Sequence, residues 1–338
     1  MTDILIMGEI LVEIMRDHED VPLDEAGVFK GPYPSGAPAI CIDAAARLGC
    51  RTMLIGSVGQ DDFGSCVLNR LERDGVDCTH ISRSADSFTG CAFVTYFADS
   101  SRKFIFHMGA ALAAEAPDIS RLPEVKYMHI MGCSLMAGSQ LSNEIRKTMQ
   151  SLSARGTKIS FDPNIRKELF TADTEDILND VLQKTNIFLP GREEFLMITK
   201  ADTVEAAVKK CFENPALEII VLKDGPNGSR LFTRDTAIGN SSAAENNPTA
   251  ENRPIAENRL IAESTPVYRV QQIDATGAGD CFDGAFLAGL CHGKTPAEAA
   301  RMGAAAGALN VMAFGPMEGN ISPENIGKMT STRGCRTK

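Results

Sequence analysis

One acidic residue, Asp280, stands at the start of a predicted helix, in a place suited to phosphate chemistry. Residues 273–283 read Ile-Asp-Ala-Thr-Gly-Ala-Gly-Asp-Cys-Phe-Asp. They follow an alternating, strand-like run at 267–273 and precede apolar residues at helical spacing, so the pattern predicts a strand, a glycine turn and a helix. The first N–H groups of such a helix, at 277–280, lack partners within the helix and attract an anion.

An acid in this position suggests catalysis as well as binding. A loop that only holds phosphate gains nothing from a second anion at contact distance, because like charges repel and raise the pKa of the acid. The Asp280 carboxylate could instead take the proton of a hydroxyl group as its oxygen attacks a phosphoryl group. The amides of Gly277, Ala278 and Gly279 would meanwhile hold the developing charge. A helix cap is the alternative interpretation of Asp280.

The turn also resembles a known signature. Residues 274–280, Asp-Ala-Thr-Gly-Ala-Gly-Asp, are similar to the C-terminal motif of the ribokinase-like (PfkB) carbohydrate kinases. In that family the last Asp is the catalytic base, and the Gly-Ala-Gly amides form the anion hole. The resemblance implies these roles for Asp280 and the three residues before it. Together with the matches below, it covers nearly the whole chain.

A second phosphate-binding pattern has the wrong context. Residues 288–295, Ala-Gly-Leu-Cys-His-Gly-Lys-Thr, fit a permissive P-loop pattern, but a predicted helix precedes them where a P-loop needs a strand. Gly293 instead marks the end of that helix, and the run Thr-Pro-Ala-Glu at 295–298 predicts an N-cap and a capping box for the next one.

Composition narrows the class of protein. The 338 residues are 43% hydrophobic and 23% charged, which is typical of a globular protein. The net charge of −10, without a basic stripe, argues against a nucleic-acid partner. No run approaches the roughly 20 apolar residues of a membrane span, and the amino end shows no signal sequence, so we expect a cytoplasmic protein without a membrane partner. Ten cysteines without a C-x-x-C pair, and five scattered histidines, indicate reduced thiols and no transition-metal site.

The amino-terminal region carries a candidate sugar contact. Residues 3–8 form an apolar run ending in glycine, typical of a buried first strand. Residues 9–14 then alternate, so that Glu9 and Glu13 share a face. An exposed edge strand would show the same alternation. In the family the acid at the place of Glu13 binds a sugar hydroxyl, and the resemblance implies that role here.

A turn-rich loop at 31–36 leads into a predicted helix of small residues at 37–48. Small side chains allow a ligand to approach the backbone closely, or they only permit tight helix packing. The run Gly-Ala-Pro-Ala at 36–39 resembles the family's N-terminal sugar-binding signature. The resemblance implies sugar contacts from Gly36 and Ala37.

Two alternating segments, 89–97 and 103–107, predict a hairpin. With the strand at Glu13 they would form the small lid sheet that closes over sugar in the family, from strands within about 9–33 and 89–107. Lid sheets in this family often serve as dimer surfaces, so a homodimer through the lid is a candidate assembly. The candidate substrate contacts here, each of them otherwise a solvated side chain, are Arg102, Lys103 and His107.

Strands that alternate with helices predict a parallel sheet covered on both faces, with ligands at the carboxyl ends of the strands. The residues 162–166, Asp-Pro-Asn-Ile-Arg, lie at such an end. They resemble a segment of fructokinase-like and ketodeoxygluconate-kinase-like members in which the Asn and Arg face substrate or phosphate. The resemblance implies such contacts from Asn164 and Arg166; a turn with an exposed arginine is the alternative. The expected elements are strands at 125–131 and 158–161 and helices near 140–154 and 174–184.

Metal and nucleotide contacts are expected from later segments. Glu194 matches the Glu of the family's Asn-x-x-Glu motif, which orders Mg²⁺ through water, and Mg²⁺ usually binds through one or two carboxylates plus substrate phosphates. The resemblance implies ATP and Mg²⁺ as cofactors, with a monovalent cation such as K⁺ as a further candidate. Lys223, after the strand at 219–222, is either a phosphate contact or a surface charge. The nucleotide contacts that the resemblance implies are Lys223, Gly225, Thr276, Gly279, Asn310 and Gly315.

At four positions the chain departs from the family patterns. The unusual residues are Ser35 for a common glycine, Ile40 for a sugar-binding asparagine, Gly191 for the Asn of Asn-x-x-Glu, and Ala275 for Thr, Ser or Pro. Ile40 has no side-chain donor or acceptor, so its sugar contact is lost or replaced.

Residues 243–266 are unlike the rest, because Ala-Glu-Asn recurs every six residues. So few repeats cannot bury a core of their own. We expect a low-complexity insertion in a surface loop of one domain that spans residues 1–338.

The sequence thus predicts a doubly wound, mostly parallel α/β sheet flanked by helices, with a small β lid, in an ATP-dependent sugar kinase. The patterns most resemble tagatose-kinase-like members, so a ketohexose such as tagatose or fructose is the expected substrate. The alternatives are ribose and 2-keto-3-deoxygluconate, whose carboxylate Arg166 or Arg102 could bind.

Two other classes of function fit the sequence less well. A silent sugar-binding sensor would not need Asp280 and Glu194. A nicotinamide-dependent dehydrogenase would need a glycine turn after its first strand, where this chain reads Met-Gly-Glu.

Overall fold

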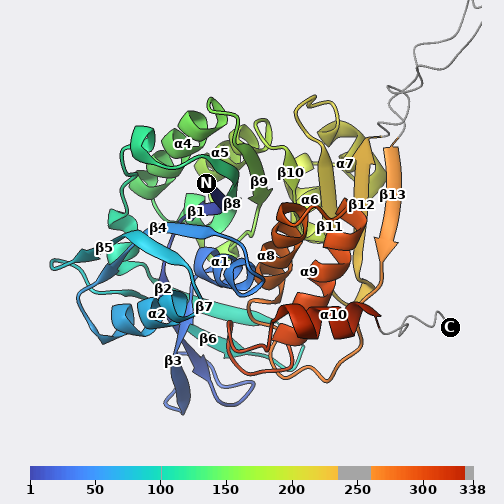
Figure 1. Ribbon diagram of the computed structural model, residues 1–338. Helices are drawn as coiled ribbons and strands as arrows, with labels where there is room; N and C mark the ends of the chain where they lie inside the picture. Colours follow the sequence, from blue (N-terminus) through green and yellow to red (C-terminus); the bar gives the residue numbers. More distant parts are fainter. Residues whose placement is uncertain (100, 235–259, 332–338) are drawn as a thin grey trace, which may run out of the picture.

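The computed structural model describes residues 1–99, 101–234 and 260–331, and its strands form two sheets (Figure 1). In the larger, sheet A, every neighbouring pair from β5 to β11 is parallel, and the pairs β11–β12 and β12–β13 are antiparallel. This confirms the predicted doubly wound, mostly parallel sheet. The spatial order of sheet A is β13 (Leu260–Thr265), β12 (Ser229–Arg234), β11 (Ile219–Lys223), β10 (Ile187–Phe188), β9 (Lys158–Asp162), β8 (Val125–Met131), β1 (Thr2–Met7), β4 (Thr52–Gly59) and β5 (Asp77–Ser84).

The central strands are apolar on both faces because helices cover both faces. All eight residues of β4 are buried, and four of the five in β11 are buried. A strand with one wet face would alternate instead. In Figure 1, α1, α8 and α9 lie on the nearer face, and α4 to α7 lie behind the sheet. The helices are α1 (Ala37–Arg47), α2 (Asp62–Arg73), α3 (Gly132–Ala137), α4 (Ser139–Ser153), α5 (Ala172–Leu182), α6 (Arg192–Thr199), α7 (Val204–Cys211), α8 (Ala278–Cys291), α9 (Pro296–Asn310) and α10 (Pro323–Ser331).

The helix boundaries show that residues 288–295 do not form a P-loop. Its first residues are the end of α8, and Thr295 is the N-cap of α9 in a capping box with Glu298. The segment therefore joins two helices, as the sequence predicts, and has no preceding strand.

The smaller sheet B lies below sheet A in the view of Figure 1. Its strands come from the two segments expected to form the lid. Because β2 lies between β3 and β6, Glu13 is not on an exposed edge strand, and that alternative is wrong. The order of sheet B is β3 (Phe29–Ser35), β2 (Leu11–Arg16), β6 (Gly90–Tyr96) and β7 (Arg102–His107).

The strand expected directly before the glycine turn is absent. Residues 267–273 belong to no strand, and the side chain of Ile273 is 56% exposed. The backbone N–H of Ile273 donates to the carbonyl of Val311, just after α9. The partner of β12 is instead β13, which lies within the segment expected to be a loop. The rest of that segment, residues 243–259, lies outside the described residues.

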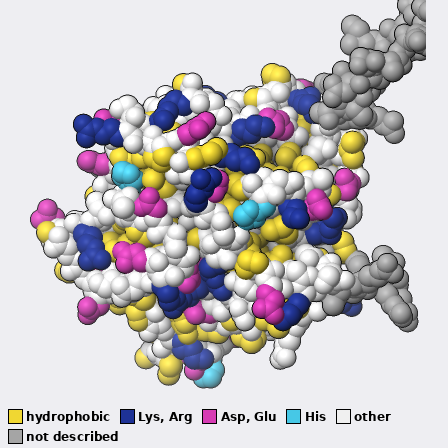
Figure 2. All heavy atoms as spheres, viewed as in Figure 1, with side chains coloured by type: hydrophobic (Ala, Val, Ile, Leu, Met, Phe, Trp, Pro, Cys, Tyr) yellow, Lys and Arg dark blue, Asp and Glu magenta, His cyan; other side chains and the backbone are white. Residues whose placement is uncertain are grey.

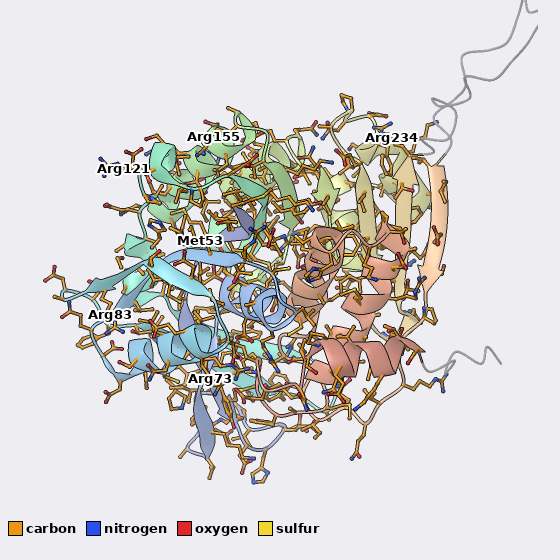
Figure 3. All side chains as sticks on the ribbon, viewed as in Figure 1. Met53, Arg73, Arg83, Arg121, Arg155 and Arg234 are labelled. Atoms are coloured by element: carbon orange, nitrogen blue, oxygen red, sulfur yellow. The ribbon has the colours of Figure 1, made fainter. Side chains whose placement is uncertain are left out.

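Charged side chains of both signs are scattered over the face shown in Figure 2, with hydrophobic side chains between them. Arginines at the outline of the molecule hold neighbouring loops (Figure 3). Arg155 donates to the carbonyls of Ile119 and Leu122, and Arg234 donates to three carbonyls between α7 and β11. Among the helices of the described chain, none is both long and apolar enough to cross a lipid bilayer.

Candidate active site

A cavity of about 570 Å³ lies where residues from both sheets and from the start of α8 meet. Its volume is within the range of small-molecule binding sites. Asn310 and Gly315, two of the expected nucleotide contacts, do not line it. Lys103 and His107 do not line it either. The expected residues that do line it are Glu13, Gly36, Ala37, Arg102, Asn164, Arg166, Glu194, Lys223, Gly225, Thr276, Gly277, Ala278, Gly279 and Asp280.

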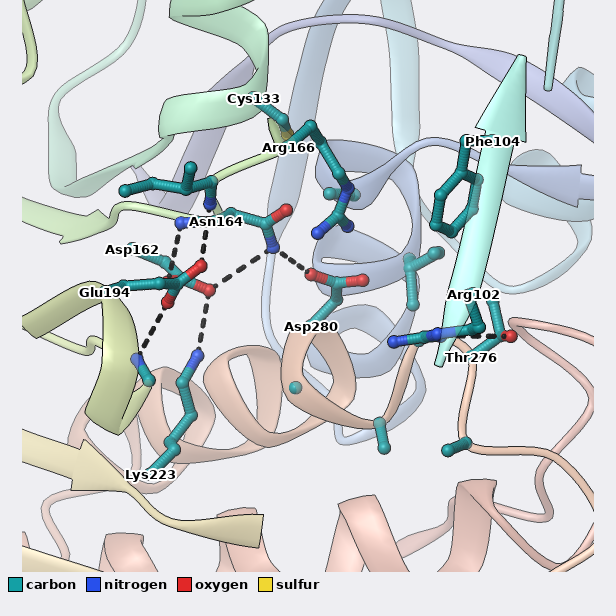
Figure 4. A pocket seen from close by; sticks show the side chains of 18 of the residues that line it. Arg102, Phe104, Cys133, Asp162, Asn164, Arg166, Glu194, Lys223, Thr276 and Asp280 are labelled. Carbon is teal, nitrogen blue, oxygen red and sulfur yellow. Dashed lines mark hydrogen bonds and ion pairs between the residues drawn. The ribbon is translucent and has the colours of Figure 1, made fainter. Parts of the chain in front are cut away.

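Asp280 lies in the first turn of α8 and faces the cavity (Figure 4). Only 5% of its surface is exposed. Among the described residues, the hydrogen-bond donor to its carboxylate is Asn164, whose Nδ2 lies 2.8 Å from Oδ1. The helix-cap interpretation is therefore not supported. Burial raises the pKa of Asp280, and Arg166 partly opposes this rise.

Asn164 and Arg166, the two contacts predicted from residues 162–166, both lie near Asp280 (Figure 4). Asn164 has a left-handed backbone, with φ of 39°, and its N–H donates to Asp162 Oδ1 at 3.1 Å. This tight turn points the Asn164 amide at Asp280. The Arg166 guanidinium points into the cavity near Asp280, with its centre 5.8 Å from the ring of Phe104 (Figure 4). The alternative of an exposed arginine is wrong.

Two buried carboxyl groups, those of Glu9 and Glu13, line another part of the cavity. Ser35 Oγ donates to Glu13 Oε1 at 2.8 Å, so the serine that replaces a common glycine orients this acid. Burial raises the pKa of Glu13 to about 7. Glu9 accepts hydrogen bonds from Cys133 and Ser134. The sequence placed Glu9 on the face of Glu13 but gave it no role.

The glycine turn is held by side chains around it. Gly277 has φ of 77°, and a Cβ there would overlap the carbonyl oxygen of Pro316. Asp274 accepts from Thr276 and from the N–H of Gly315, while Asn310 donates to the Thr276 carbonyl at 2.7 Å. Asn310 and Gly315 thus brace the turn and do not reach the cavity.

One of the expected amide donors is already engaged. The N–H of Ala278 donates to the carbonyl of Ala275 at 3.3 Å. The first turn of a helix has no intrahelical acceptors for its N–H groups, so Gly279 and Asp280 carry the donors best placed for a ligand.

The lid contacts the same turn. The Tyr96 hydroxyl at the end of β6 lies 3.0 Å from Thr276 Oγ1, and Arg102 Nη1 of β7 donates to Thr276 Oγ1 at 3.3 Å. Arg102 therefore lines the cavity, although it remains exposed to solvent on the strand.

Lys223 is not the surface charge that one interpretation expected. Its ammonium group donates to Asp162 and Asp283, beside the cavity. Asp283 is fully buried on α8, one turn after Asp280. The sequence gave Asp162 and Asp283 no role. The spacing of Asp280 and Asp283 on one helix face was the available signal.

Glu194 lines the cavity with a fixed carboxylate. Its oxygens accept from the N–H groups of Ile165 at 2.7 Å and Gly191 at 2.9 Å. Burial raises its pKa. Among the described residues, no three His, Cys, Asp or Glu side chains are grouped to hold a metal ion. The chain nevertheless fits Mg²⁺, which usually needs only one or two carboxylates beside waters and substrate phosphates.

Comparison with known proteins identifies the family. The model of the pfkB family carbohydrate kinases matches residues 1–249 and 256–323. Fructokinase-1 from Oryza sativa subsp. japonica is 29% identical over 287 residues, which are 83% of this chain and 80% of that protein. Fructokinase-1 from Zea mays is 28% identical over 287 residues, which are 83% of this chain and 80% of the maize protein.

Solved structures agree with this family. An E. coli protein assigned as ribokinase II is 35% identical in two crystal structures, one in apo form and one in complex with ATP and Mg²⁺. Their TM-scores are 0.84 and 0.83, and each match covers 97% of this chain and 99% of that protein. A fructokinase from Vibrio cholerae O395, bound to fructose, ADP and calcium, has a TM-score of 0.77 over 98% of this chain and 99% of its own. At 21% identity it supports the fold alone.

Proposed function

This chain belongs to the pfkB family of carbohydrate kinases, and from that premise we propose that it transfers the terminal phosphoryl group of ATP to a hydroxyl group of a ketohexose. The observation that carries the proposal is the Asp280 carboxylate, which faces the cavity from the first turn of α8. It lies beside backbone donors and near the half-buried Arg166.

Asp280 acts as the general base. Asn164 binds Oδ1, which leaves Oδ2 to accept the proton of the sugar hydroxyl as its oxygen attacks phosphorus. Burial raises the pKa of Asp280 and makes its carboxylate a stronger base than one in water. The pKa rise is limited because Arg166 stabilises the ionised form.

The N-terminus of α8 and Arg166 hold the transferring phosphoryl group. The N–H groups of Gly279 and Asp280 point out of the helix end, where its dipole favours negative charge. Arg166 supplies a planar set of donors that matches phosphate oxygens. Glu194 would hold Mg²⁺ through water, and Mg²⁺ would neutralise charge on the phosphates of ATP.

A neutral ketohexose suits the acids at the other part of the cavity. Glu13 and Glu9 can accept hydrogen bonds from sugar hydroxyl groups, and Ser35 fixes the orientation of Glu13. The similarity to plant fructokinases supports fructose, or its isomer tagatose, as the first candidates.

One observation favours a second candidate. Arg102 and Arg166 both line the cavity, with their guanidinium carbons 5.9 Å and 5.8 Å from the centre of the Phe104 ring. Two cations suit the carboxylate of a sugar acid such as 2-keto-3-deoxygluconate better than a neutral sugar. Ribose remains a further alternative substrate.

An assay of ADP release separates these substrates. Purified protein with ATP and Mg²⁺ would be offered tagatose, fructose, ribose and 2-keto-3-deoxygluconate in turn. We expect the highest kcat/KM for a ketohexose. The highest value for the sugar acid would assign Arg102 and Arg166 to its carboxylate. Binding of sugar and ATP without ADP formation from any substrate would contradict a kinase function and favour a sensor.

The role of Asp280 is tested by Asp280→Asn. The amide cannot accept the proton, so kcat should fall roughly 10²- to 10⁴-fold while calorimetric binding of ATP and sugar is retained. Asp62→Asn is the matched control, because Asp62 is also an acid in the first turn of a helix, α2, and does not line this cavity. An active Asp280→Asn enzyme would exclude Asp280 as the base.

A further inference from the structure

A buried lysine lies next to the proposed base without touching it. Lys223 ends β11, and 15% of its side chain is exposed. Its Nζ lies 2.8 Å from Asp162 Oδ2, and 3.0 Å and 2.9 Å from the two carboxylate oxygens of Asp283. An ammonium group has three N–H donors, so these three contacts occupy all of them. A phosphate contact from Lys223 would require one of them to break.

These contacts connect Lys223 to Asp280. Asp162 accepts from Lys223 at Oδ2, and the Asn164 amide, which donates to Asp280, also lies 3.4 Å from Asp162 Oδ2 (Figure 4). Asp283 is on α8 with Asp280. The sequence of contacts from Asp280 through Asn164, Asp162 and Lys223 to Asp283 therefore begins and ends on one helix.

The ionisation of Asp162 and Asp283 depends on Lys223. Burial alone would lower the pKa of Lys223, but Asp162 and Asp283 raise it above its usual range, so the ammonium stays charged. Burial would raise the pKa of Asp162, but the net shift is downward because Lys223 and Asp283 stabilise its ionised form. Burial raises the pKa of Asp283, and the Asp162 charge adds to the rise. The lysine therefore favours the ionised form of Asp162, whereas burial favours the protonated form of Asp283.

We propose that Lys223 is a positioning residue for the phosphoryl transfer: through Asp162 it fixes the Asn164 amide, which aligns the Asp280 carboxylate, and it does not bind the nucleotide. This inference rests on the proposed function. Its physical basis is that Asn164 is held at two points by Asp162, at its N–H and near its Nδ2. Without Lys223, the Asp162 carboxylate loses its cation and has no fixed orientation.

Removing Lys223 also changes the field at Asp280. Lys223 lowers the pKa of Asp280, whereas burial and Asp162 raise it. Loss of the lysine therefore raises the pKa of Asp280, and the base becomes ionised only at higher pH. The other titratable or charged groups around Asp280 and Lys223 are Cys41 of α1, Cys133 of α3, His129 of β8, Asp162 of β9, Arg166 after β9, Glu194 of α6, and Cys281 and Asp283 of α8.

The test is Lys223→Met, which keeps most of the length of the side chain and removes its charge. With the substrate found by the ADP-release assay, kcat should fall roughly 10- to 100-fold because the base is misplaced. The acidic limb of the kcat–pH profile should move to higher pH, because Lys223 no longer lowers the pKa of Asp280. The KM for ATP should stay within about twofold, because uniform ATP binding is untouched. A lysine that only binds phosphate would give the opposite result, a higher KM for ATP with kcat almost unchanged.

A second variant distinguishes a loss of function from a loss of folding. Lys223→Met alone leaves Asp162 and Asp283 without a cation, whereas Lys223→Met with Asp283→Asn removes one positive and one acidic group together. The double variant should fold, as judged by its thermal unfolding, and show the same fall in kcat and the same pH shift. Asp283→Asn alone keeps the Lys223–Asp162 contact and should keep kcat within about threefold of wild type.

The outcomes separate the inference from the proposed function. A wild-type enzyme that phosphorylates a sugar, together with a folded double variant of normal kcat and unshifted pH profile, would overturn the role of Lys223 alone. A wild-type protein inactive on every sugar would overturn the proposed function first.

Discussion

Asp280, Glu9 and Glu13 are buried carboxyl groups that line one cavity, and each has different surroundings. Asp280 is bound by an amide and faces an arginine, which leaves one oxygen free for a proton. Glu9 is held by Cys133 and Ser134. Glu13 is bound by Ser35 alone at Oε1, and its Oε2 is buried without a partner among the described residues. Such an oxygen is the expected acceptor for a ligand hydroxyl, because an unpaired buried acceptor is costly.

The pKa of Glu13 leads to a prediction for sugar binding. Burial raises this pKa from 4.5 to about 7, so Glu13 becomes ionised as the pH rises from 6 to 8. A carboxylate accepts stronger hydrogen bonds than a carboxylic acid, so the Kd for the sugar should be lower at pH 8 than at pH 6, by up to about tenfold. Titration calorimetry with sugar alone measures this. The titration should be carried out on the Asp280→Asn variant, because this substitution removes the Asp280 carboxyl group as a second titrating acid.

The control for this titration is Asp280→Asn combined with Glu13→Gln. Glutamine does not titrate, so the double variant should bind sugar more weakly and with the same Kd at both pH values. A pH dependence that persists in the double variant would assign the effect to another group and remove Glu13 from the sugar site.

At the scale of elements, the glycine turn and the first turn of α8 place the chemistry, and their two outer glycines have different reasons to be glycine. Gly277 needs its left-handed backbone and lies against Pro316. Gly279 is helical, and the nearest atom to an added Cβ is Lys223 Nζ at 3.8 Å, so nothing in the fold excludes a side chain there. Its absence keeps the cavity open beside the helix N-terminus.

Two alanine variants should therefore behave in opposite ways. Gly277→Ala should lower Tm by at least about 2 °C, because a left-handed alanine costs about 1 kcal/mol before any overlap with Pro316. Gly279→Ala should keep or raise Tm, since alanine favours a helix by up to about 1 kcal/mol. It should nevertheless reduce kcat/KM for ATP, because the methyl group occupies the place of a phosphate oxygen. Differential scanning calorimetry and steady-state kinetics measure the two effects. Normal kinetics for Gly279→Ala would show that phosphate does not approach this turn.

The sequence could predict those elements whose pattern has a local cause. Apolar runs predict β1 and β11, and glycine and capping residues predict α8 and α9. The alternation at 267–273 wrongly predicted a strand. A strand also needs a neighbouring strand with free backbone groups, and β12 pairs with β13 instead. The pairing of β12 depends on the whole of sheet A, so the seven residues 267–273 alone do not predict it.

The candidate site shows the same limit. Local motifs predict that Asp280 and Asn164 belong to the site, since residue types and turns can be recognised directly from the sequence. The contacts of Lys223 with Asp162 and Asp283 join three separate elements, so only the fold reveals them. Likewise, Asn310 and Gly315 belong to the right region but brace the turn and do not line the cavity.

At the scale of the whole molecule, β12 has two connections with different relations to the site. At one end, residues 225–227 line the cavity, and Lys223 and Ser229 are paired across the turn. At the other end, Arg234 is paired with Leu260, so the described chain enters and leaves residues 235–259 at adjacent positions of one antiparallel ladder. Along the six residues of β12, these ends are about 17 Å apart.

Residues 235–259 should therefore be dispensable for catalysis. Replacing them by Asn-Gly would join Arg234 to Leu260 as a two-residue hairpin, a connection that antiparallel strands readily accept. We expect kcat and both KM values within about twofold of the full chain, because the cavity lies at the opposite end of β12 and loop length has a small effect on stability. The family match is also interrupted within this segment, at residues 250–255, as expected for an insertion.

The same replacement at the other end of β12 is the matched control. Exchanging residues 224–228 for Asn-Gly also leaves a hairpin, between Lys223 and Ser229, but removes Gly225 and its neighbours from the cavity wall. This variant should raise the KM for ATP several-fold while the first variant does not. If the loss of residues 235–259 raised the KM for ATP as strongly as the loss of residues 224–228, the repeats would have to act on the site, and an inert insertion would be excluded.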